Sequence, residues 1–80
     1  MDKIPESLAE KYNMADFDGF VSSHSELEYY LTFLVQTDHI PNKIVEAQYF
    51  GEETEDYTEI LQARDFCRTK INELSGTDIA

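Results

Sequence analysis

Acidic residues gather in one short stretch of this 80-residue chain. Five acids fall within eight residues, with no Lys or Arg among them: Glu52, Glu53, Glu55, Asp56 and Glu59. The whole chain carries 17 acids against 6 bases, which gives a formal net charge of −11. Carboxylates held this close repel one another, and a positively charged partner relieves the repulsion. A nucleic-acid-binding groove is such a partner, because its Lys and Arg side chains normally meet phosphates.

Aromatic residues flank the acids on both sides. Tyr49 and Phe50 precede them and Tyr57 lies among them. Aromatic side chains commonly anchor protein interfaces inside a polar rim. With five Phe and five Tyr in so short a chain, we expect some aromatic surface to stay exposed, which favours a protein partner or a homodimer. The predicted partner-binding set is therefore Tyr49, Phe50, Glu52, Glu53, Glu55, Asp56, Tyr57 and Glu59.

A purely structural interpretation of the acids stands beside the functional one. Thr54 is a residue type that caps helix starts, and Glu55 and Asp56 would then meet the positive end of the helix dipole. Charge runs are also often solvated helix faces. The sequence leaves both interpretations open.

No residue pattern indicates catalysis, a metal or a cofactor. Cys67 is the single cysteine and lies on an apolar stripe, which predicts a buried thiol. His24 and His39 have no second ligand at zinc spacing. Asp16, Asp18 and Gly19 resemble part of a calcium loop, but Ser25 stands where the bidentate Glu belongs, so a turn is expected. We therefore expect a binding protein and not an enzyme.

The charge and the chain start indicate the setting. A net charge of −11 makes direct binding to nucleic acid or to an anionic membrane unfavourable. Met1 to Ala9 does not resemble a signal peptide, and no apolar run is long enough to cross a bilayer. We expect a cytoplasmic protein.

Helix signals recur along the chain. Pro5 predicts a first helix that continues through Asn13, and residues 15–22 read as a packed loop because they contain turn formers. Ser23 with Glu26, and Ser25 with Glu28, are capping-box patterns that predict a central helix ending near Asp38. Its expected core stripe is Leu27, Tyr30, Leu31 and Leu34, and Tyr29, Phe33 and Val35 widen this stripe beyond one narrow face.

Two further helices are expected. Residues 41–50 predict a helix that ends at Gly51, although a strand over residues 43–50 is the alternative. Thr54 predicts the start of a last helix, which Gly76 ends. Its apolar stripe comprises Tyr57, Ile60, Leu61, Cys67, Ile71 and Leu74. The chain is thus predicted to form one all-α domain over residues 1–80, a compact bundle of about four short helices with residues 76–80 frayed.

Three functional hypotheses follow. The leading one is a small acidic protein that inhibits or regulates a basic nucleic-acid-handling protein by nucleic-acid mimicry, as phage host-takeover and anti-defence proteins do. The second is an antitoxin or bacteriocin-immunity protein. Tyr29 and Tyr30 resemble the paired tyrosines of the colicin-immunity class, but the resemblance covers two residues and lacks the surrounding Asp and Pro, so no site is transferred. The third is a self-associating assembly protein.

Overall fold

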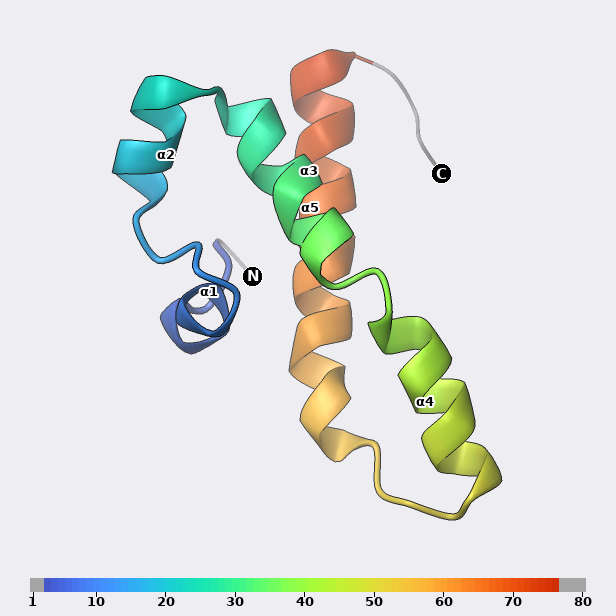
Figure 1. The fold of residues 1–80 in the computed structure, drawn as a ribbon. Helices are drawn as coiled ribbons and strands as arrows, with labels where there is room; N and C mark the ends of the chain where they lie inside the picture. The colour runs from blue at the N-terminus through green and yellow to red at the C-terminus, as the bar shows by residue number, and fades with distance from the viewer. Residues whose placement is uncertain (1–2, 77–80) are drawn as a thin grey trace.

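The computed structural model describes residues 3–76 and is all-α (Figure 1). Five α-helices and one 3-10 turn follow one another: α1 (Glu6–Lys11), α2 (Phe17–Ser23), α3 (Glu26–Gln36), α4 (Ile40–Tyr49), η1 (Glu55–Tyr57) and α5 (Thr58–Ser75). The predicted helical class is confirmed, and the strand alternative for residues 43–50 is wrong because α4 occupies them. Of the residues predicted to fray, 76–80, Gly76 caps the end of α5 with a φ of 69°, and residues 77–80 lie outside the described residues.

The hydrophobic core forms where α3 packs along α5, with α1 and α2 covering one side (Figure 1). Phe33, Ile60 and Ile71 are fully buried between these helices. The stripe predicted on α3 is partly wrong, because Leu31 and Val35 are exposed, whereas Tyr29 and Phe33 are buried as expected. Apolar residues surround this helix on several sides, and tertiary packing decides which of them face the core.

The segment predicted as a loop contains a helix. Asp16 caps α2, because its carboxylate accepts a 3.0 Å hydrogen bond from the Gly19 backbone N–H. A Cβ at position 19 would collide with that carboxylate, so glycine permits the close approach. The residues that favour turns here also favour a helix start. The Ser25 cap is confirmed, since its hydroxyl accepts from the Glu28 N–H at 3.1 Å.

The start of the last helix also differs from the prediction. Thr54 makes no side-chain cap hydrogen bond, and the chain first forms the 3-10 turn η1. The α-helix begins only at Thr58, so Glu59 lies in its first turn. The stabilising contact with the helix dipole that was predicted for Glu55 and Asp56 is therefore made by Glu59 instead.

The molecule is elongated, because α4 and the start of α5 project from the packed helices (Figure 1). Its extents are 42 × 27 × 19 Å and its radius of gyration is 13.5 Å. A compact domain of this length would have a radius of gyration of about 12 Å. Only one stripe of α4, comprising Ile40, Ile44 and Ala47, packs against the rest of the molecule. The opposite face of α4 is therefore left to solvent.

Candidate functional site

Two neighbouring aromatic side chains, Tyr49 and Phe50, are exposed to solvent at the end of α4. Tyr49 is 84 % exposed and Phe50 is 66 % exposed. Their ring centroids lie 5.1 Å apart and their planes are nearly perpendicular, at 89°. Two adjacent large aromatic side chains at this exposure are unusual in a small soluble domain and are typical of interaction sites. The sequence analysis selected both residues.

Two further residues share this face of α4. Val45 is 66 % exposed and precedes Tyr49 by one helical turn, while the exposed Glu46 precedes Phe50 by one turn. The sequence analysis missed both, although their i, i+4 spacing to the aromatic pair was the signal that identifies them. We call the surface formed by Val45, Glu46, Tyr49, Phe50, Glu52 and Glu53 the α4 tip.

A glycine fixes how the acids follow the aromatic rings. Gly51 has a φ of 72°, in the left-handed region that was predicted for it. Its N–H donates to the Gln48 carbonyl at 3.2 Å, and the Glu52 N–H donates to the Ala47 carbonyl at 2.8 Å. These two bonds are those of a Schellman motif, which ends a helix and turns the chain sharply. Glu52 and Glu53 are therefore exposed immediately after the rings.

The remaining predicted site residues lie beyond this turn. Glu55 is exposed in η1, and the backbone of Asp56 belongs to the same turn. Glu59 is exposed in the first turn of α5. Tyr57 is half-buried and packs against the core, so it is not part of the exposed aromatic pair.

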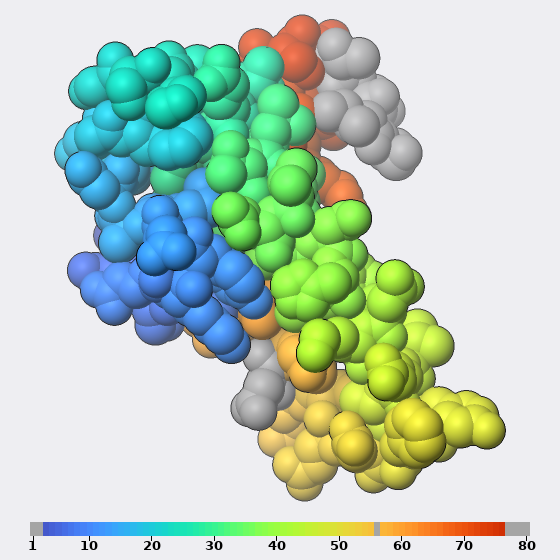
Figure 2. All heavy atoms as spheres, viewed as in Figure 1, coloured from blue at the N-terminus to red at the C-terminus, as the bar shows by residue number. Residues whose placement is uncertain are grey.

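The charge of the molecule is concentrated around the α4 tip. Residues 44–63 contain six acids and no base, whereas the other 60 residues contain eleven acids and six bases. In Figure 2 the residues near 50 project at one end of the molecule, away from α1 and α2. Among the described residues, the ion pairs join Arg68 to Asp65 and Lys70 to Glu73, both on α5 and both outside the tip. Glu46, Glu52, Glu53, Glu55 and Glu59, whose side chains the structure describes, thus form no ion pair with the chain's own bases.

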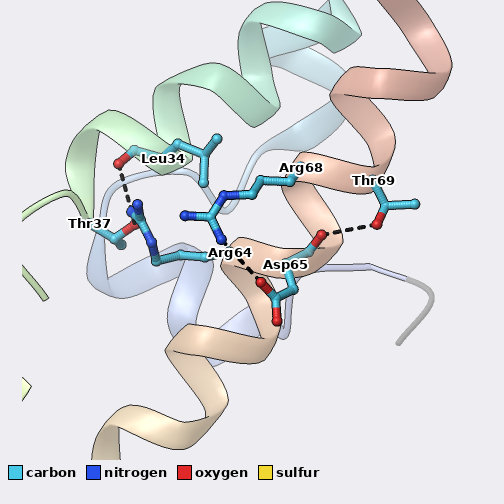
Figure 3. A network of polar contacts seen from close by, with 6 residues as sticks. All are labelled: Leu34, Thr37, Arg64, Asp65, Arg68 and Thr69. Atoms are coloured by element: carbon cyan, nitrogen blue, oxygen red, sulfur yellow. Dashed lines mark hydrogen bonds and ion pairs between the residues drawn. The ribbon is translucent and has the colours of Figure 1, made fainter. Parts of the chain in front are cut away.

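A buried arginine fixes the corner from which α4 departs (Figure 3). Arg64, on α5, donates from Nη1 to the Leu34 carbonyl at 2.8 Å and to the Thr37 hydroxyl at 2.6 Å. The Thr37 hydroxyl in turn donates to the Phe33 carbonyl at 2.8 Å. The Asp38 N–H donates a hydrogen bond to the Val35 carbonyl at 3.3 Å and not to the Leu34 carbonyl four residues before it. The Leu34 carbonyl therefore accepts its hydrogen bond from Arg64.

The position of Arg64 at the end of a helix stabilises its positive charge. A cation at the C-terminal end of α3 meets the negative end of the helix dipole. Burial, and then the neighbouring Arg68 charge, lower the pKa of Arg64, but a guanidinium stays protonated in proteins. Because Thr37 lies three residues before Ile40, this network holds the base of α4 against α5. No local sequence pattern indicates these partners of Arg64.

The other reactive side chains are structural. Cys67 is buried, and burial raises the pKa of its thiol to about 12, so it is not a nucleophile at neutral pH. Burial and then the nearby Glu26 raise the pKa of Tyr30 to about 12. The Tyr29 hydroxyl donates to the Met14 carbonyl at 2.8 Å. The paired tyrosines therefore belong to the core.

These shifts predict a loss of stability at high pH. The folded pKa values of Cys67 and Tyr30 are raised above their ordinary values of 9.0 and 10.0, so the folded state favours the neutral forms. Below pH 9 the contribution is fully present, and it is lost as pH rises from about 9 towards about 12, because the unfolded chain ionises first. Urea unfolding across this range should show a falling midpoint. The fall should be shallower in Cys67→Ala, and a midpoint independent of pH would contradict the assignment.

No metal-binding or membrane-spanning element emerges from residues 3–76. Among the side chains that the structure describes, which leave out Asp56, no group of three or more His, Cys, Asp or Glu could hold a metal ion. His24 ends α2 and stacks on Phe20 at 4.5 Å, and His39 precedes α4. No helix in the same range has both the length and the apolar character needed to cross a bilayer.

Comparison with known proteins adds no relative. No protein-family model, no curated protein and no solved structure matches the chain significantly. The function must therefore be argued from the surface itself.

Proposed function

We propose that this protein binds a basic, nucleic-acid-handling protein through the α4 tip and thereby inhibits or regulates it. The observation that carries the proposal is the aromatic pair Tyr49 and Phe50, uncovered at 84 % and 66 % exposure and followed by Glu52 and Glu53. Desolvated aromatic residues supply much of the binding energy at protein interfaces. The surrounding charge determines which partner they can reach.

Electrostatics favours a cationic partner. Residues 44–63 contain six acids and no base, so a nucleic acid or an anionic membrane would be repelled from this surface. Carboxylates can instead occupy Lys and Arg positions that normally meet phosphates. The proposed activity is therefore nucleic-acid mimicry, in the manner of cytoplasmic phage takeover or anti-defence proteins, which are likewise small and acidic.

Two other functions use the same surface differently. Self-association through the α4 tip would bring together two copies of net charge −11, each with its acids at the contact, which is electrostatically unfavourable. An antitoxin or immunity role requires a basic toxin as the partner. The resemblance to immunity proteins does not support it, because Tyr29 and Tyr30 are buried.

Charge neutralisation at the tip tests the proposal. Glu46, Glu52 and Glu53 are exposed and lie outside the first turn of any α-helix, so replacing all three by Gln should leave the fold intact. We expect association with the partner to become about tenfold slower and less sensitive to salt, because these charges steer the encounter. Surface plasmon resonance at low and raised salt, with the partner captured from the host, measures both rates.

A matched variant controls for total charge. Glu10→Gln, Asp65→Asn and Glu73→Gln also remove three exposed acids, but all lie outside residues 44–63. This control should associate at close to the wild-type rate. If the two triple variants slow association equally, only the net charge matters and the α4 tip is not the contact.

A further inference from the structure

The aromatic rings of the α4 tip have no cation of their own. Elsewhere in the chain, Lys11 Nζ lies 6.0 Å from the centroid of the Tyr12 ring and Lys70 Nζ lies 5.7 Å from that of Phe66. Among residues 3–76, no Lys or Arg takes such a position over Tyr49 or Phe50. Tyr49 and Phe50 are thus the most exposed aromatic side chains of the described residues, and none of the chain's own cations lies over their rings.

Acidic residues are close to these two aromatic residues along the chain. Glu46 falls between Tyr49 and Phe50 around the helix and one turn before Phe50, and Glu53 follows Tyr49 by four residues across the Gly51 turn. Because the two ring planes are nearly perpendicular, at 89°, their faces point in different directions. The surface thus combines aromatic faces with carboxylates that form no ion pair within the described chain.

We infer that the α4 tip recognises arginine in preference to lysine, so that its partner presents an arginine-rich segment; this inference rests on the proposed function. A guanidinium is planar, stacks on aromatic faces and pairs with carboxylates through two parallel hydrogen bonds. An ammonium is a compact charge that holds its water strongly and gains less from an aromatic face. The acids alone would attract both cations, and the rings supply the discrimination.

Two peptides of equal length and charge test the preference. One alternates Arg with Ser and the other alternates Lys with Ser, and each is titrated at low salt into the ¹⁵N-labelled full chain. We expect both to shift the amide signals of residues 45–53, with the Arg peptide binding about fivefold to tenfold more tightly. Equal affinity for the two peptides at the tip overturns the arginine preference and leaves the proposed function standing. Failure of both peptides to shift the tip amides overturns the proposed function as well.

A variant pair assigns the preference to the rings. Replacing Tyr49 and Phe50 by Leu keeps apolar bulk at the tip and removes both aromatic faces, so affinity for the Arg peptide should fall to that for the Lys peptide. Val45→Ala removes exposed apolar surface without touching a ring, and it should leave the ratio of the two affinities unchanged. An Arg preference that survives unchanged in the Leu variant would show that the carboxylates discriminate without the rings, and the assignment of the preference to the rings would then be wrong.

Discussion

Replacing Arg64 by alanine should lower the free energy of unfolding by about 3 kcal/mol, a large effect for a polar residue. The change removes a buried cation whose Nη1 donates to the Leu34 carbonyl at 2.8 Å and to the Thr37 hydroxyl at 2.6 Å. The Leu34 carbonyl would then be left without the partner that satisfies it, and the packing of the arginine stem would be lost as well. Urea denaturation followed by far-ultraviolet circular dichroism measures the loss.

Arg68 provides the matched control on the same helix. Its side chain is largely solvated and pairs with Asp65 at 3.1 Å on the surface. Arg68→Ala should therefore change the free energy of unfolding by less than about 1 kcal/mol. If the two alanine variants lose equal stability, Arg64 does not hold α3 to α5 as described.

Replacing Tyr49 by alanine should weaken partner binding by about 2 kcal/mol, which corresponds to roughly thirtyfold faster dissociation. The ring is 84 % exposed in the free protein, so its removal should leave the free energy of unfolding within about 0.5 kcal/mol of wild type. Anchors that become desolvated after docking act on dissociation, whereas the tip acids act on association. Phe50→Ala should behave similarly.

Val35 provides a control for exposed apolar surface in general. It is 74 % exposed but lies on α3, outside the α4 tip. Val35→Ala should leave both binding rates unchanged. If Tyr49→Ala dissociates no faster than Val35→Ala, the aromatic pair does not anchor the partner and the acids alone carry the interaction.

Local signals predicted most of the helices. Ser25 was predicted as a cap from its own side-chain chemistry, and Gly51 as a helix end from its conformational freedom. The same kind of reasoning failed at Asp16, because Asp and Gly favour both turns and helix starts, and local sequence does not separate the two. The prediction that Thr54 caps the last α-helix was also wrong, since a 3-10 turn precedes α5.

The site was predicted in part. Its acids and its aromatic pair are evident from composition and spacing. Periodicity placed Tyr57 on the apolar stripe of the last helix, where it does pack inwards, but its position among the acids also placed it in the predicted partner-binding set. Arg64 is the clearest example of a residue whose role could not be predicted, since its hydrogen-bond partners lie 30 and 27 residues away in the chain. Such a network depends on tertiary proximity, which no local pattern encodes.

Amide hydrogen exchange of the full chain, alone and bound to the protein captured from its host, tests the central claim most directly. If the α4 tip is the contact, the amides of residues 45–53 should exchange more slowly in the complex, while those of α1 and α2 should be unchanged. The contradictory result is a stable complex in which the tip amides exchange as fast as in the free protein and protection appears only on α1, α2 or α3.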